Sequence, residues 1–247
     1  MGGTFCPDDG SADPYGLLQG FLAHARQRGL RVLTSESVVS LDREGGRVVG
    51  VSTSQDRYRT PILVNAAGPY ADQVGALAGV AIPSKPYRRQ VIVTDPLPGF
   101  PDVFPLVVDL DTGWYVHRQG RSAVLMGGTD KDQHPGYDTT VDWAAFDLVF
   151  KAAGKRVPAL AEAKVMRAYA GLRDLTPDYH GILGEAREAP GFYVACGFSG
   201  HGFMHSPAVG LLMAELILDG RTRSMDITPL ALDRFERGGL SIETNMF

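Results

Sequence analysis

The sequence predicts a mixed α/β fold, in which strand–turn–helix units surround an inserted, mostly antiparallel sheet. Two strand-like runs, residues 62–65 and 192–195, each lead through a turn of small residues into a helical pattern. Residues 83–164, by contrast, begin with short alternating runs separated by turns that contain Pro or Gly, as in antiparallel sheets. We therefore expect two parts, one made of residues 1–82 and 165–247 and the other of residues 83–164.

The composition is that of an ordinary globular protein. The 247 residues are 44% hydrophobic and 21% charged, which suffices to bury a core in one large or two small domains. A net charge of −4 and a pI near 5.9 give no basic footprint, so nucleic acid is not an expected partner. The longest apolar run, residues 209–218, is interrupted by Glu215, so we expect no membrane insertion. The only cysteines, Cys6 and Cys196, favour a reducing compartment, and we expect a cytoplasmic protein.

The first part is expected to begin with an amphipathic helix. Asp13 and Pro14 form an N-cap followed by proline at the first helical position, apolar residues follow at helical spacing, and Gly29 ends the pattern. We expect the apolar face of this helix to pack on the rest of the protein. A short strand, a hairpin around a Glu-Gly-Gly-Arg turn, a buried strand and a helix should follow, at residues 31–33, 38–41 with 48–53, 62–65 and 70–78.

The inserted part is predicted to be a sheet covered by one helix. Asp142 is the candidate cap of that helix, which carries Trp143, Phe146, Val149 and Phe150 on one face. The expected strands of the sheet are residues 87–94, 106–109, 114–117 and 123–127. From residue 165 the chain returns to strands and turns, and it should end in a long helix closed by Gly220, with Val209, Leu212, Met213, Leu216 and Ile217 on its apolar face.

The loop of residues 197–202 is the most specific local signal for a ligand site. It connects the strand-like run 192–195 to the last helix, and its glycines let the main chain approach a ligand closely. The first turn of the helix adds unpaired N–H donors and a partial positive charge. An anionic or electron-rich ligand, or a flat cofactor, would rest there. By itself, the same pattern is also common where a strand simply connects to a helix.

Five motifs occur in order along the chain, at residues 8–14 (DDGSADP), 64–70 (VNAAGPY), 88–90 (RRQ), 170–178 (AGLRDLTPD) and 197–203 (GFSGHGF). Together they resemble the FAD-dependent amino-acid and amine oxidoreductases, the family of D-amino-acid oxidase, glycine oxidase and the sarcosine and dimethylglycine enzymes. The resemblance runs the length of the chain. Its closest branch looks like the sarcosine oxidase β-subunit and dimethylglycine group.

The resemblance implies a partial FAD-binding Rossmann-like domain, formed by residues 1–82 and 165–247, with residues 83–164 inserted as a substrate-binding antiparallel sheet. Family members begin with a strand, a Gly-x-Gly-x-x-Gly turn and a helix that hold the FAD pyrophosphate, and no segment of this chain matches that unit. We therefore expect a truncated or split product, or a gene model that starts late. A second chain that supplies the missing unit is one expected partner.

The resemblance also implies which residues contact FAD. The loop of residues 197–202 would approach the pyrimidine edge of the flavin, where a helix N-terminus stabilises the reduced form. Gly171 lies where monomeric sarcosine oxidase-like enzymes carry the Cys that is linked to flavin, so FAD should be non-covalent. Two further segments would contact the adenine and the pyrophosphate or ribityl chain, although the first also reads as a core strand. The expected cofactor-binding residues are Val38, Val39, Ala66, Ala67, Gly68, Ser199, Gly200, His201, Gly202 and Phe203.

Arg173 is the expected substrate-binding residue, because it resembles the arginine that holds the substrate carboxylate in glycine oxidase and D-amino-acid oxidase. A guanidinium can grip a carboxylate with two parallel hydrogen bonds and so orient the substrate. The alternative is an arginine ion-paired with Asp174 or Asp178. Tyr115 would assist Arg173, the alternative being simple packing. Met204 stands where the sarcosine branch commonly has Lys, so a second cationic contact to the carboxylate is missing.

The leading functional hypothesis is an FAD-dependent enzyme that oxidises the C–N bond of an amino acid or N-methyl amino acid. Hydride transfer to flavin N5 would give an imine. The alternative is a catalytically silent family relative that serves as an assembly or interaction subunit. A metal-dependent hydrolase is a third reading, because His201 and His205 are spaced i, i+4. No His-Glu-x-x-His arrangement and no third ligand accompany them, so we expect no metal.

Overall fold

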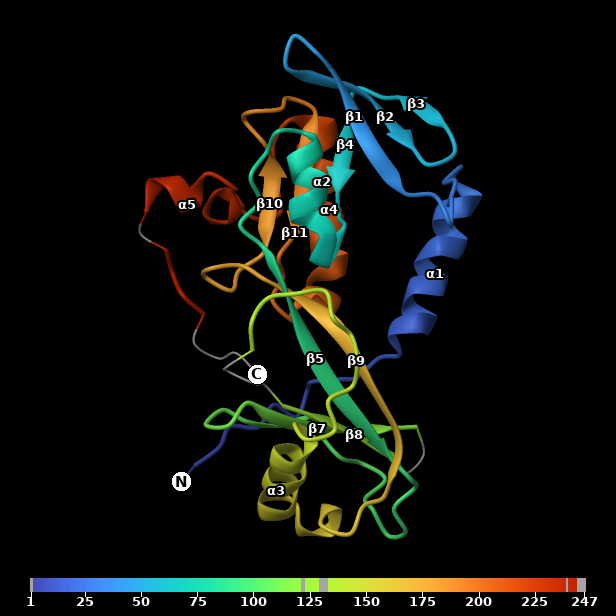
Figure 1. Ribbon diagram of the computed structural model, residues 1–247, viewed down its shortest axis with the longest axis vertical. Helices are drawn as coiled ribbons and strands as arrows, with labels where there is room; N and C mark the ends of the chain where they lie inside the picture. The colour runs from blue at the N-terminus through green and yellow to red at the C-terminus, as the bar shows by residue number, and fades with distance from the viewer. Residues whose placement is uncertain (1, 121–122, 129–132, 239, 244–247) are drawn as a thin grey trace.

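The computed structural model describes residues 2–120, 123–128, 133–238 and 240–243. Figure 1 shows two small sheets together with the helices α2 and α4 at one end of the molecule, and a larger sheet with the helix α3 at the other. The long strands β5 (Lys85–Thr94) and β9 (Val165–Leu175) run side by side between the two ends. The structure thus confirms the mixed α/β fold with an antiparallel sheet, and β5 and β9 link its two ends.

Helix α1 (Pro14–Gln27) begins where the sequence predicts it. The Asp13 carboxylate accepts a hydrogen bond from the Gly16 N–H at 2.7 Å, and Pro14 occupies the first position. The expected packing of its apolar face is wrong, because the helix has no buried residue and Leu18 and Phe21 are each 53% exposed. The predicted strand at residues 31–33 is also wrong, because no strand in the described part of the chain pairs with that segment.

A hairpin follows, formed by β1 (Val38–Glu44) and β2 (Arg47–Thr53), and β3 (Arg57–Arg59) extends it to three strands. Glu44 pairs with Arg47, so the loop between them has two residues. Gly45 and Gly46 have φ values of 57° and 86°, the left-handed pair that matches the twist of a two-residue hairpin. The predicted turn is therefore confirmed.

The second small sheet has the order β10 (Ile182–Glu185), β11 (Phe192–Cys196) and β4 (Leu63–Asn65), and β4 runs parallel to β11. After β4 the chain turns through a short 3-10 helix (Gly68–Tyr70) into α2 (Ala71–Leu77). The buried Asn65 holds this turn, because its side chain donates to the Ala71 carbonyl at 2.9 Å and accepts from the Ala67 N–H at 3.2 Å.

Helix α4 (Gly202–Asp219) packs on β10 through Leu212 and Met213, which lie in one buried cluster with Leu183. The chain then passes a 3-10 helix (Thr228–Leu230) and the short helix α5 (Arg234–Arg237). None of the helices in the described residues is long and apolar enough to cross a membrane.

The five-stranded antiparallel sheet has the order β6 (Val107–Asp109), β7 (Trp114–Gln119), β8 (Ala123–Gly127), β5 and β9. Helix α3 (Phe146–Arg156) covers one face, and the apolar residues between them form one core that includes Ile92, Trp114, Met126, Phe146 and Val149. This helix starts later than the sequence predicts. Asp142 instead accepts a hydrogen bond from the Ala144 N–H, while its own N–H donates to the Gln90 side chain, so it belongs to the turn before the helix.

Strand β9 pairs with β5 along its whole length, from Val165 opposite Thr94 to Leu175 opposite Lys85. Strand β9 is therefore part of the five-stranded sheet. The division of the chain at residues 82/83 and 164/165 remains a prediction.

Candidate functional site

A cleft of ≈ 720 Å³ lies where the end of β9, the loop before α4 and the turn after β4 meet. The face of the five-stranded sheet that α3 does not cover also forms part of the cleft, through residues of β5. Glycines are common in its walls, and charged side chains are few. The lining residues that the following argument uses are Ala66, Gly68, Arg89, Tyr169, Gly171, Arg173, Asp174, Cys196, Gly200, Gly202 and Gly210.

Arg173 reaches the cleft from β9, opposite Tyr87 of β5. Its guanidinium lies against the backbone of Gly200, where an added Cβ would stand only 2.9 Å from Arg173 Cζ. Burial lowers the pKa of this guanidinium from its ordinary value, while the electrostatic effects of Tyr115 and Asp174 oppose that change. The side chain therefore places a desolvated cation beside the glycine-rich loop.

Tyr115 lies on β7, opposite Gly127 of β8. Its phenol covers that glycine, because a Cβ at Gly127 would stand 2.5 Å from the Tyr115 hydroxyl oxygen. Burial raises the pKa of the Tyr115 hydroxyl, and Arg173, Tyr169 and Arg89 also act on it electrostatically. The structure thus brings Tyr115 near the two arginines as a protonated phenol, although it is not one of the residues that line the cleft.

The loop of residues 197–202 contributes to the cleft chiefly through its glycines. Gly200 and Gly202 line it. The side chain of Ser199 points away, because it is buried and its hydroxyl donates to the Gly197 carbonyl and accepts from the Thr176 N–H. Phe203 follows in the first turn of α4 and is 40% exposed outside the cleft.

His201 occupies the cap position of α4. Burial, followed by the neighbouring His205, lowers the pKa of its imidazole, and the ring centres of the two histidines are 5.8 Å apart. Within the residues that the structure describes, no three His, Cys, Asp or Glu side chains gather around a point that would suit a metal ion.

The other expected cofactor residues divide into two groups. Ala66 and Gly68, in the turn after β4, line the cleft, whereas Ala67 does not and donates its N–H to Asn65. Val38 and Val39 lie on β1, away from the cleft, and are 41% and 52% exposed. The structure therefore brings together Ala66, Gly68, Arg173, Gly200 and Gly202, and it leaves Val38 and Val39 on a separate surface.

Two charged residues of the cleft were not among the expected site residues. Asp174 follows Arg173, and its carboxylate accepts the Gly197 N–H at 2.6 Å while its carbonyl accepts the Ser199 N–H at 3.0 Å. Arg89 of β5 lies opposite Gly171 and donates hydrogen bonds to the Arg88 carbonyl and the Gln133 side chain. The sequence contains a signal for Arg89. Side chains alternate between the two faces of a sheet, so Arg89, Gly171 and Arg173 share one face.

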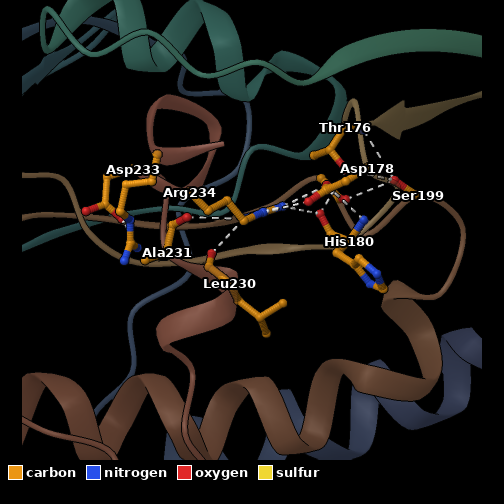
Figure 2. Close-up of polar contacts among 10 residues, drawn as sticks. Thr176, Asp178, His180, Ser199, Leu230, Ala231, Asp233 and Arg234 are labelled. Atoms are coloured by element: carbon orange, nitrogen blue, oxygen red, sulfur yellow. Dashed lines mark hydrogen bonds and ion pairs between the residues drawn. The ribbon is translucent and has the colours of Figure 1, made fainter. Parts of the chain in front are cut away.

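A buried ion pair stabilises the chain just beyond this site (Figure 2). Arg234 of α5 donates two hydrogen bonds to the Asp178 carboxylate, at 2.8 and 3.0 Å, and a third to the His180 carbonyl at 2.8 Å. Thr176 also donates to the His180 carbonyl, and it contacts Ser199. Asp178 therefore has Arg234 as its partner, so the alternative in which it pairs with Arg173 is not what the structure has.

The comparison with protein families decides the identity of the chain. The model of the FAD dependent oxidoreductase family, DAO, matches residues 1–216. The chain belongs to the DAO family. This membership confirms the resemblance, the oxidoreductase class and FAD as the cofactor of the family.

Individual DAO-family relatives agree. The chain is 32% identical to human mitochondrial sarcosine dehydrogenase over 89% of its own length and 25% of that protein. It is 31% identical to the hydrogen cyanide synthase subunit HcnC of Pseudomonas protegens, over 92% of its own length and 53% of that protein. The crystal structure of L-proline dehydrogenase from P. horikoshii superposes with a TM-score of 0.89 and 33% identity, covering 95% of this chain and 63% of that one. The chain thus spans less than two thirds of each of these relatives.

The cleft of this DAO-family chain has features that suit part of a flavin. Gly171 and Gly210 have open space where a Cβ would stand, so the walls can accept a flat ring. The N–H groups at the start of α4, beginning with Gly202, have no acceptor within the helix and can donate to a ligand oxygen. Cys196 also lines the cleft, but burial raises the pKa of its thiol to about 12, so it is a poor nucleophile.

Proposed function

We propose that this chain forms the substrate-binding wall and the flavin-edge wall of an FAD-dependent enzyme that oxidises the C–N bond of an amino acid or N-methyl amino acid. One observation carries the proposal. A desolvated arginine, Arg173, lies in direct contact with Gly200, in the loop that leads into the N-terminus of α4. This arrangement brings a carboxylate grip and a set of backbone N–H donors to one cleft.

The side chains of the cleft would bind the substrate, and FAD would accept the hydride. Arg173 would hold the substrate carboxylate with two parallel hydrogen bonds and so fix the orientation of the carbon next to nitrogen. Tyr115, whose buried phenol interacts electrostatically with Arg173, would assist that arginine. When bound, FAD would supply the hydride acceptor at flavin N5, and it would be held without a covalent bond.

The backbone would contribute most of the cofactor contacts. The N–H groups of Gly200, Gly202 and Phe203 would face the electron-rich pyrimidine edge of the flavin, where the α4 dipole favours negative charge, whereas the His201 N–H donates to the Phe198 carbonyl. Ala66 and Gly68 would lie along the ribityl or pyrophosphate part. Val38 and Val39 would contact the adenine through their main chain, on the exposed surface of β1.

The test is a substrate-induced change of colour. The protein, loaded with FAD, should be yellow and should bleach under anaerobic conditions when sarcosine, glycine or proline is added in turn. Arg173→Lys should lose most of this response through weaker substrate binding, because lysine cannot form the two parallel bonds. Arg167→Lys, on the same strand but outside the cleft, is the matched control and should bleach like the wild type. A protein that cannot be loaded with FAD, or an Arg173→Lys variant with normal bleaching, contradicts the proposal.

A second candidate function is assembly with another polypeptide segment, and the exposed surface of α1 favours it. Tyr15, Leu18 and Phe21 are exposed on this helix, and Val64 is exposed on β4, which is the edge strand of its sheet among the described residues. Exposed apolar surface and an open strand edge suit a strand and helix that carry the Gly-x-Gly-x-x-Gly turn, in the same protein or in a second chain.

Sedimentation velocity tests the assembly function. The wild-type chain should self-associate or bind a separately expressed strand–turn–helix segment that carries a Gly-x-Gly-x-x-Gly turn, and Leu18→Glu with Phe21→Glu should abolish that binding. Gln19→Glu, on the same helix, is the control for added charge. A monodisperse wild-type monomer that ignores the added unit contradicts assembly through this surface. A catalytically silent subunit would assemble in this way but fail the bleaching test.

A further inference from the structure

The end of β9 and the loop of residues 197–202 are joined at more than one point. Asp174 accepts the Gly197 N–H with its carboxylate at 2.6 Å and the Ser199 N–H with its carbonyl at 3.0 Å. The preceding residue, Arg173, packs its guanidinium against Gly200. Two consecutive residues of one strand thus contact three residues of the loop. The Asp174 side chain contacts Gly197, and the Arg173 side chain contacts Gly200.

The loop needs such support because its backbone is unusual. Gly197, Ser199 and Gly200 have φ values of 73°, 53° and 102°, all in the left-handed region. For Ser199 this conformation is uncommon, and a residue in it is retained only where its surroundings hold it. The backbone N–H of Ser199 is fixed by Asp174, and its hydroxyl is fixed by Gly197 and Thr176.

The carboxylate of Asp174 is well placed to select one loop conformation. Burial raises the pKa of this carboxyl, whereas the Gly197 N–H lowers it. The hydrogen bond to Gly197 is short, and it ties the residue that directly follows β11 to the residue that directly follows Arg173. If this bond were lost, the loop could move away from Arg173 without any change in the sheet.

We propose that Asp174 is a positioning residue, whose carboxylate holds the loop of residues 197–202 against Arg173 and so fixes the guanidinium where it meets a bound carboxylate ligand. The proposal rests on the proposed function, since it takes Arg173 as the carboxylate-binding group. Asp174 does not itself contact the ligand. It acts by fixing the distance between Arg173 and the N–H groups at the start of α4.

Three substitutions separate the geometry of the contact from its charge. Asp174→Asn keeps an oxygen acceptor at the same distance and removes the charge. Asp174→Glu keeps the charge and displaces the oxygen by one methylene. Asp174→Ala removes both. If Asp174 positions the loop by its hydrogen bond, Asp174→Asn should behave like the wild type and the other two should not.

The measurement is an NMR titration of the whole chain with acetate, which needs neither FAD nor turnover. Hydrogen exchange of the Gly197 amide reports the loop, acetate-induced shifts report binding, and the melting midpoint reports stability. We expect Asp174→Ala and Asp174→Glu to bind acetate roughly tenfold more weakly, with faster exchange at Gly197, as the loss of a buried hydrogen-bond partner implies. Asp174→Asn should stay within about twofold of the wild type, as should the control Asp219→Asn on the far end of α4.

The outcomes are distinguishable. If Asp174→Ala unfolds, the acetate affinities of Asp174→Glu and Asp174→Asn still test the positioning role. Normal acetate affinity in Asp174→Ala or Asp174→Glu, or equal weakening in Asp174→Asn, overturns the positioning role. If the wild type does not bind acetate, or binds it equally well after Arg173→Lys, the proposed function fails, and the inference that depends on it fails too.

Discussion

Arg173 and Gly200 lie in direct contact, and only a glycine leaves room for the guanidinium. A Cβ at position 200 would stand 2.9 Å from Arg173 Cζ and 3.0 Å from Nε. The backbone at Gly200 also has a φ of 102°, which side-chain-bearing residues rarely adopt. Two independent constraints therefore require glycine here, one from the conformation and one from the neighbour.

Gly200→Ala should disturb both stability and substrate binding. The left-handed backbone should cost about 1–3 kcal/mol of unfolding free energy. The displaced guanidinium should lower kcat/KM roughly 100-fold, as expected for a misplacement of about 1 Å. Chemical denaturation and steady-state kinetics measure the two effects. Gly20→Ala in α1, where a Cβ meets nothing within 4 Å, is the control and should be neutral or stabilising by about 0.5–1 kcal/mol. Normal kinetics in Gly200→Ala would show that Arg173 does not need its present position.

The ion pair of Asp178 and Arg234 should be a major determinant of stability. Both side chains are buried, so removal of one partner leaves an unpaired charge. Asp178→Asn or Arg234→Met should each lower the unfolding free energy by about 3–5 kcal/mol, whereas the double variant should lose less than the sum. Denaturant unfolding of the two single variants and the double variant forms the cycle. Additive losses would mean that the two residues act independently.

The same pair predicts how stability depends on acid. Burial acts to raise the pKa of the Asp178 carboxyl, but the hydrogen bonds and charge of Arg234 hold it below its ordinary value. A carboxyl with a lowered pKa in the folded state stabilises the fold above its ordinary pKa of about 3.9 and loses that contribution as the pH falls through the lower folded value. Melting midpoints should therefore drop more steeply below about pH 4 in the wild type than in the double variant of Asp178 and Arg234. Parallel curves would contradict this assignment.

The two thiols should differ sharply in reactivity. Burial raises the pKa of Cys196 to about 12, whereas Cys6 is exposed. A thiol reagent at pH 8 should modify Cys6 quickly in the folded protein and Cys196 only after denaturation, because the thiolate is the reactive form. Mass spectrometry of the modified peptides distinguishes the sites, and Cys6→Ser should remove the fast phase. Rapid labelling of Cys196 in the native state would mean that the cleft opens more than the structure shows.

The imidazole of His201 should have a lower pKa in the folded chain than in the unfolded one. Burial and then His205 lower the pKa of its imidazole below the ordinary value. Such a histidine stabilises the fold above its ordinary pKa of about 6.5, and that contribution is lost as the pH falls. An NMR titration should give a lower pKa for His201 in the folded chain than in urea. His205→Gln should raise the pKa of His201, and an unchanged value in that variant would contradict the contribution of His205.

The sequence allowed the local elements to be predicted where a residue type determines a backbone conformation. The Asp13 cap, the Gly45-Gly46 turn and the closing Gly220 were all confirmed, because each acts through its own or its nearest neighbours' backbone. Residues 31–33 were predicted wrongly, because apolar β-formers become a strand only if another strand pairs with them. The start of α3 was misplaced, since Asp142 prefers a contact with Gln90 that is distant in sequence.

The candidate site could be predicted in part for the same reason. The loop of residues 197–202 and Arg173 were found through motifs, and the structure brings them into contact. Asp174 was considered only as a partner for Arg173, because a sequence does not show that its carboxylate meets the Gly197 N–H. The burial of the Ser199 side chain could not be predicted either, since it depends on contact with Thr176, which directly follows β9.

The pairing of β5 with β9 brings the entry and the exit of the large sheet together. The chain enters this sheet at Lys85 and leaves it at Leu175, and these two residues lie opposite each other on the paired strands. Residues 95–164 join the remainder of the chain at Thr94 and Val165, which also pair, and they contact β5 further along, where β8 pairs with residues 91–93 and Gln133 binds Arg89. The outer strands and α3 therefore attach to the rest of the protein largely through β5, and Arg173 and its loop lie at the other end of the β5–β9 ribbon.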